Sequence, residues 1–142
     1  MLVPDLDQAV VRYLRLADIA QRKGQISGRN RFLLLAAVDA CHTGLLEVAT
    51  LCREQVLTDE PRHLIGQYAT IPDAIRSQDF EPFARRLKRF CSREQAEHLL
   101  QQQSETGFAM AEWDSILVYA RWMMQQSHWT LKGDDSEPVT EA

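Results

Sequence analysis

Residues 30–61 read NRFLLLAAVDACHTGLLEVATLCREQVLTDEP, and this stretch decides the fold class. Apolar and small residues recur in it at steps of three and four on both sides of Gly44, which is the spacing of one face of an α-helix. Two residues separate the periodic segments, so the helices that they form should lie antiparallel. We therefore predict a helical hairpin with helices at 30–42 and 45–57, which Pro61 closes.

Helical periodicity continues on both sides of this hairpin. Upstream, residues 5–22 predict an amphipathic helix, and Gly24 and Gly28 bracket the loop that follows it. Downstream, an N-cap threonine, an early proline and a capping-box acid predict a short helix that begins near Ile71. A stripe of aromatic residues predicts the next helix at 80–90.

Two further helices complete the expected fold. Ser92 and Gln95 form the pattern of a capping box, which starts a helix, and residues 110–126 carry two apolar stripes that need two neighbours. The alternation of β-branched and aromatic residues that marks strands does not occur in the sequence. The sequence thus predicts one all-α domain over residues 1–131, a compact bundle of roughly six or seven helices built from antiparallel hairpins. The acidic tail at 132–142 is expected to be disordered.

The composition argues against several classes of protein. The chain has 142 residues, 45% of them hydrophobic, and its longest apolar stretches fall far short of the roughly 20 residues that span a bilayer. Asp5 and Asp7 lie where a secretory signal needs positive charge. The three cysteines are an odd number without CxxC spacing, which argues against a disulfide framework and a zinc ribbon. We expect a cytoplasmic protein without a membrane role.

Charge divides unevenly along the chain. The 16 Lys and Arg against 20 Asp and Glu give a formal charge of -4, which counts against a dedicated nucleic-acid binder. Residues 1–93 hold 14 basic and 11 acidic groups, whereas residues 94–142 hold 2 and 9. The two parts are therefore expected to attract each other.

The hairpin at 30–61 carries small, apolar and turn residues at particular positions, namely Ala37, Gly44, Leu46, Ala49, Val56, Leu57 and Pro61. In these positions it resembles a tetratricopeptide repeat, over about a quarter of the chain. Leu33, Ala40 and Arg53 stand where that family has large aromatic residues. The chain is thus similar to a single repeat hairpin and not to a repeat array, which needs several stacked units.

The resemblance implies that the first helix of the hairpin lines a concave peptide-binding surface. The residues that would line it are Arg31, Leu34, Leu35, Val38 and His42. Arg31 and His42 are the two polar enough to select a ligand. The alternative is that the three apolar residues are buried by the first or the last helix.

The sharpest local feature is a basic segment at 82–93, in which cations surround apolar residues of one helix. Its cations are Arg85, Arg86, Lys88, Arg89 and Arg93, with Arg29 and Arg31 as an extension of the patch. Such a cluster can grip phosphates or an acidic peptide. The alternative is a solvated helix face whose charges meet the acidic part of the chain.

Residue patterns for catalysis or metal binding are incomplete. The spacing of Glu60 and His63 is a fragment of a di-metal motif, and Glu94 and His98 share a face that is expected to point to solvent. Cys41 and His42 are adjacent, and adjacent residues on a helix point about 100 degrees apart. They therefore cannot act together as nucleophile and base. We predict no catalytic residue, no cofactor and no metal site.

These observations favour a protein-interaction module, either an adaptor or a regulator, with an unidentified protein partner. The alternative is binding of nucleic acid or an acidic partner through the basic segment at 82–93. A further alternative is a helical enzyme with a dispersed site, in which His42 or His63 lies in a pocket. Val118 and Trp122 form a stripe that a two-fold homodimer would cover.

Overall fold

The computed structural model describes residues 4–102, 115–126 and 128–129, and its regular elements are all helical. The predicted all-α bundle is confirmed. In the described residues the α-helices are α1 (Pro4–Arg22), α2 (Ile26–His42), α3 (Leu46–Asp59), α4 (Ile71–Arg76), α5 (Glu81–Phe90), α6 (Arg93–Gln102) and α7 (Ile116–Met124). Two 3-10 helices, η1 (Leu64–Gln67) and η2 (Gln78–Phe80), lie between α3 and α5.

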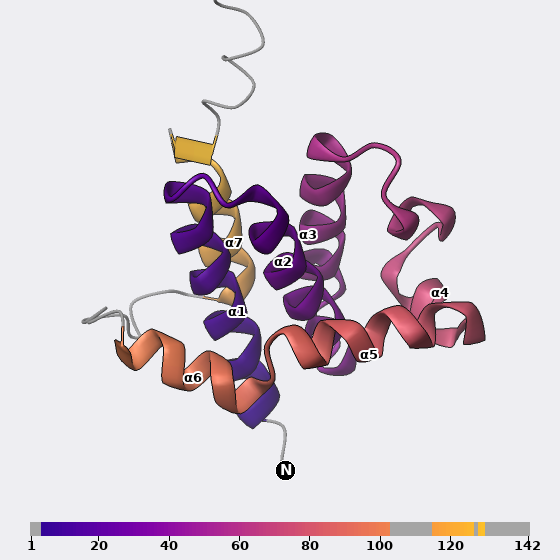
Figure 1. Cartoon of the computed structure of the whole chain (residues 1–142), viewed down its shortest axis with the longest axis horizontal. Coiled ribbons are helices and arrows are strands. Elements are labelled where there is room, and N and C mark those ends of the chain that lie inside the picture. Colours follow the sequence, from indigo (N-terminus) through magenta and orange to yellow (C-terminus); the bar gives the residue numbers. More distant parts are fainter. Residues whose placement is uncertain (1–3, 103–114, 127, 130–142) are drawn as a thin grey trace, which may run out of the picture.

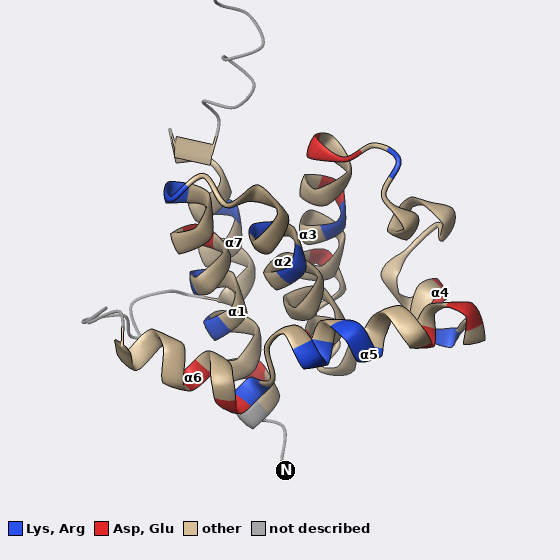
Figure 2. Ribbon diagram, in the orientation of Figure 1, with Lys and Arg blue, Asp and Glu red and all other residues tan. Residues whose placement is uncertain are grey.

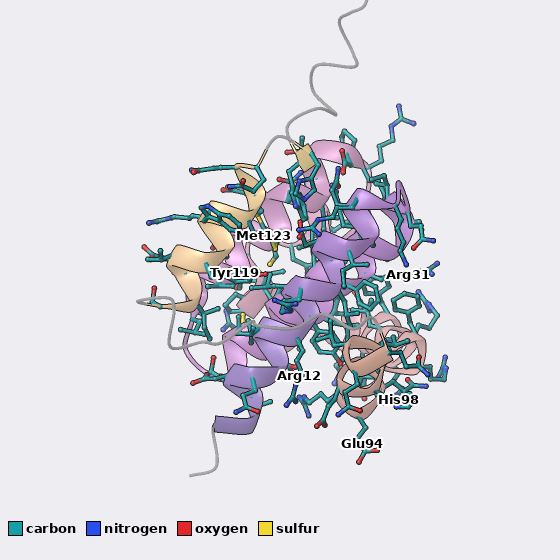
Figure 3. All side chains as sticks on the ribbon, turned by 90° about the vertical axis from the view of Figure 1, so that its left-hand side faces the viewer. Arg12, Arg31, Glu94, His98, Tyr119 and Met123 are labelled. Atoms are coloured by element: carbon teal, nitrogen blue, oxygen red, sulfur yellow. The ribbon has the colours of Figure 1, made fainter. Side chains whose placement is uncertain are left out.

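The helix α2 is the centre of the bundle. It packs against α1 and α3, and α5 crosses it on its outer side (Figure 1). Nine residues of α2 are buried, because it is covered by neighbours on several sides. The helix α7 packs against α1 and α3, with Tyr119 and Met123 turned toward the core (Figure 3). The helix α6 contacts α1, so the chain returns to its first helix.

Local sequence determines where several helices begin. The Thr70 hydroxyl accepts a hydrogen bond from the backbone N–H of Asp73 at 3.1 Å, as an N-cap should. At α6 the capping box is reciprocal: the Ser92 N–H donates to Gln95 Oε1 at 2.8 Å, and the Gln95 N–H donates to Ser92 Oγ at 3.1 Å. Both predicted caps are confirmed.

Two predicted helix starts are wrong. The helix α2 begins at Ile26 rather than residue 30, because Gly28 is helical instead of closing a loop. The predicted helix over 110–126 cannot be continuous, because Ser115 has extended backbone and caps α7 by accepting from the Val118 N–H. Residues 103–114 lie outside the described residues, as does the tail at 132–142 for which disorder is predicted.

Two glycines provide a matched test of the backbone. Gly44 has a φ of +83°, a left-handed conformation in the turn after α2, so Gly44→Ala should lower the free energy of unfolding by about 1 kcal/mol. Gly28 is helical, and a Cβ added there would meet only Phe90 Cζ at 3.9 Å, so Gly28→Ala should be neutral or slightly stabilising. Urea unfolding followed by circular dichroism measures both. Equal changes in the free energy of unfolding would contradict the different backbone conformations of Gly44 and Gly28.

Candidate functional site

The helix α5 presents its cations to solvent because its other side is held against the core. Leu87 is buried, as is Phe80 just before the helix, and both belong to the hydrophobic core. The cations occupy the remaining positions, and Arg85, Arg86, Lys88 and Arg89 are all exposed. Figure 2 shows the basic positions along α5 and the acidic positions of α6, which follows it in the chain. The structure therefore places these four predicted residues on one exposed helix.

Aromatic rings hold two arginines at the flank of this helix. The Arg86 guanidinium lies 5.5 Å from the centre of the Phe83 ring, and that of Arg31 lies 4.9 Å from the centre of the Phe90 ring. Phe90 packs on Phe32 of α2, with the two ring centres 5.1 Å apart, and Phe90 is still 37% exposed. Arg31 thus joins the α5 cations across the helix crossing. We call Arg31, Arg85, Arg86, Lys88, Arg89 and Phe90 the basic surface.

Most charges of the basic surface have no ion pair within the described part of the chain. Arg85 pairs with Glu81 at 3.1 Å on the same helix. Among residues 4–102, 115–126 and 128–129, none of the ion pairs involves Arg31, Arg86, Lys88 or Arg89. Attraction was predicted between residues 1–93 and residues 94–142. Arg12 Nη2 lies 4.0 Å from Glu97 Oε2, an ion pair that joins these two parts of the chain.

Arg93 has a different role from the α5 cations. Its Nε and Nη2 donate to the two carboxylate oxygens of Asp39 at 3.1 and 2.6 Å, and Asp39 is buried on α2. This hydrogen bonding raises the pKa of Arg93. The Tyr13 hydroxyl donates to the backbone oxygen of Cys91 at 2.9 Å, so both contacts fasten the α5–α6 junction to the bundle. Arg93 is half-exposed, but its charge is paired with Asp39, so we do not count it with the α5 cations.

A cavity of about 210 Å³ lies between α2, α5 and the start of α6. Its apolar lining consists of Leu35, Val38, Ala84 and Leu87, with Tyr13 beside them. The polar residues around it are Asp39, Lys88, Ser92, Arg93 and Glu94. Lys88 belongs both to this cavity and to the basic surface, so the two features are continuous.

The concave groove implied by the repeat resemblance is not open. Leu34 and Leu35 are buried, because α1 packs along α2 and α5 crosses it. Arg31 and His42 are both exposed, but they are eleven positions apart on α2, about 16 Å along a helix. The structure therefore does not assemble these residues into one peptide groove.

Arg29 was expected to extend the basic patch, and this is wrong. Its side chain is completely buried and forms an ion pair with Asp59, while its Nη1 donates to Gln21 Oε1 at 2.7 Å. Burial lowers the pKa of Arg29, and the Asp59 carboxylate opposes that effect. Trp129 covers the guanidinium, with its ring centre 5.1 Å away. Sequence reasoning missed this buried cluster, because nothing local distinguishes Arg29 from Arg31.

The residues considered for catalysis have structural roles or lie apart. His63 Nδ1 accepts from the Ile65 N–H at 3.0 Å, and burial lowers the pKa of the imidazole. Glu94 and His98 are exposed and point away from the bundle (Figure 3). Within the described residues, no three His, Cys, Asp or Glu side chains are placed to hold a metal ion.

The cysteines are free thiols that stay protonated near neutral pH. Burial raises the pKa of Cys41 and of Cys91 to about 11, and that of Cys52 to about 12. A thiolate is the reactive form of cysteine, so these thiols are poor nucleophiles.

Comparisons with protein families, curated proteins and solved structures found no match for this chain. Across the helices that the structure describes, none has the length and apolar character needed to cross a bilayer.

Proposed function

We propose that the chain is a protein-interaction module and that the basic surface binds an acidic segment of a protein partner. The observation that carries this proposal is the exposure of Arg31, Arg86 and Lys88 together with Arg89, without an ion pair in the described residues. The two cation–π contacts hold Arg31 and Arg86 in place before binding, which reduces the ordering cost of association. Complementary charge would also speed the encounter.

A protein segment suits this surface better than a nucleic acid. The exposed acids Glu81, Glu94 and Glu97 lie on α5 and α6; Glu81 is paired with Arg85, and Glu94 borders the same cavity as Lys88. A long phosphate backbone would pass over these carboxylates, whereas a short peptide need only cover the ten residues of α5. The formal charge of -4 also favours a protein segment over a nucleic acid.

Nucleic acid is the second candidate, and the exposed ring of Phe90 favours it. A base can stack on such an aromatic ring while nearby arginines hold the phosphates. The Arg31 guanidinium lies over the Phe90 ring, so a base that stacks on this face would take its place. Cytoplasmic location is also part of the proposal, supported by the three free thiols.

The triple variant Arg31→Gln/Arg86→Gln/Arg89→Gln tests the basic surface. We expect it to bind a labelled peptide of alternating Glu and Gly at least tenfold more weakly than the unaltered protein at about 0.1 M salt, because three exposed cations are lost. Fluorescence anisotropy measures the affinity. Raising the salt to about 0.5 M should weaken the unaltered protein toward the same level, since ionic contacts are then screened.

A matched control is Lys23→Gln/Arg62→Gln/Arg121→Gln, which removes the same charge from exposed positions elsewhere. Equal losses in the two triple variants, or no binding by the unaltered protein, would contradict the proposal. A labelled single-stranded oligonucleotide is measured in parallel. Tighter binding of the oligonucleotide than of the peptide, with loss in the first triple variant, would replace the proposal by the second candidate.

A further inference from the structure

The cavity next to Lys88 offers a chemistry that the basic surface lacks. Its floor is apolar and comes from two helices, with Leu35 and Val38 on α2 and Ala84 and Leu87 on α5. Its volume of about 210 Å³ is smaller than the roughly 300–1,000 Å³ typical of small-molecule pockets. The space suits one large side chain rather than a cofactor.

Four of the residues around the cavity, Tyr13, Asp39, Ser92 and Arg93, already have hydrogen-bond partners inside the protein. The Tyr13 hydroxyl donates to the Cys91 carbonyl, and Arg93 forms two hydrogen bonds with Asp39. Ser92 Oγ accepts from the Gln95 N–H. A guest in the cavity is therefore recognised mainly by its apolar surface, because burying apolar area needs no hydrogen-bond partner.

Charge at the mouth of the cavity differs between its two sides. Lys88 lies on the α5 side and continues into Arg85 and Arg89. Arg93 and Glu94 lie on the α6 side, where the charge of Arg93 is paired with Asp39 and that of Glu94 has no ion pair in the described residues. Acidic residues of a bound segment would be attracted toward α5 and repelled near Glu94. An apolar residue of that segment can reach the cavity while its acidic neighbours lie along α5.

We infer that the cavity receives one apolar side chain, of about the size of Leu or Phe, from the acidic protein segment. This inference rests on the proposed function and specifies the partner: an acidic sequence with a single large apolar anchor. The cations set the charge requirement, and the cavity selects among acidic sequences. Anchor residues seated in pockets carry much of the affinity in protein interfaces.

Labelled peptides with the same acidic residues around one variable position test this inference. The variable residue is Gly, Ala, Leu or Phe, and anisotropy gives the affinity of each peptide. We expect the better of the Leu and Phe peptides to bind at least tenfold more tightly than the Gly peptide, because one large side chain leaves water. Equal affinities across the four peptides would overturn the inference while leaving the proposed function intact.

Variants that fill the cavity provide the second arm. In Ala84→Phe and in Val38→Phe, which approach it from different helices, the Leu and Gly peptides should bind alike. The matched control is Thr50→Phe on the exposed side of α3, which should keep the full difference. A difference that survives both filling variants would overturn the inference. Far-ultraviolet circular dichroism checks that each variant is folded.

Methyl NMR of the unaltered protein gives a readout that does not depend on any variant. Adding the Leu peptide should shift the methyl resonances of Leu35, Val38 and Leu87, and leave that of the exposed Leu46 in place. Failure of those three resonances to move while the peptide binds would exclude the cavity. If no peptide binds at all, the proposed function fails together with the inference. Leu-dependent binding that is insensitive to salt and to the triple variant would instead support the cavity and contradict the basic surface.

Discussion

Arg29→Met should lower the free energy of unfolding by about 3–5 kcal/mol, the loss expected when one partner of a buried ion pair is removed. Arg29 is 0% exposed, and its guanidinium is bonded to Asp59, to Gln21 Oε1 at 2.7 Å and to Asn30 Oδ1 at 2.6 Å. Methionine fills a similar volume without any of these hydrogen bonds. The Asp59 carboxylate would then stay buried without the guanidinium beside it.

Two further variants separate lost charge pairing from lost volume. Arg31→Met, two residues along α2 and exposed, should change the stability by less than about 0.5 kcal/mol. The double variant Arg29→Met/Asp59→Leu should recover much of the loss, because it removes the buried carboxylate as well. Urea unfolding provides the free energies. If Arg29→Met were as mild as Arg31→Met, the buried ion pair would not contribute to the fold.

Trp129→Ala should cost about 3–5 kcal/mol, as expected for truncating a large buried aromatic side chain. Trp129 is 3% exposed, and its indole N–H donates to Asp18 Oδ1 at 2.6 Å. The same carboxylate contacts His128 Nε2 at 2.6 Å and Arg22 at 2.9 Å. Loss of the indole would also uncover Arg29, on which the ring is stacked. Trp129, which follows α7, is thus part of the folded core.

The comparison for this variant is Trp122→Ala on α7, where the side chain is 46% exposed and the loss should be smaller. Because Trp129 and Arg29 share one cluster, the double variant Arg29→Met/Trp129→Ala should cost less than the two single losses added together. Thermal and urea unfolding followed by tryptophan fluorescence measure these effects. Additive losses would show that the two residues contribute independently.

The helical segments were predictable because their causes are local. The spacing of apolar residues predicted α1 and α3 to within two residues at either end, and the capping residues located α4 and α6. The basic helix was likewise visible, since α5 places its cations and its core residues on different sides. The predicted start of α2 failed because a glycine can be helical when a neighbour packs on it, and here Phe90 lies beside Gly28.

The candidate site was predictable only in part. Four of its cations follow from the period of one helix. Arg31 was predicted as an extension of the patch, but the contact that joins it to them exists because α5 crosses α2 and brings Phe90 to it. Arg93 belongs to the same stretch of sequence, yet its guanidinium is bonded to Asp39, 54 residues away. The cavity could not be foreseen, because its lining combines α2 and α5.

The sequence by itself determined an all-α chain, the approximate position of its helices and the charge of α5, since helix periodicity, capping and net charge are properties of neighbouring residues. The tertiary structure alone decided which polar groups are buried. Arg29 and Arg31 are the same residue type on one helix, and they differ because 3.6 residues per turn aim the first at Asp59 and Trp129 and the second at Phe90. Only the packing of distant helices makes one arginine a core residue and leaves the other on the surface.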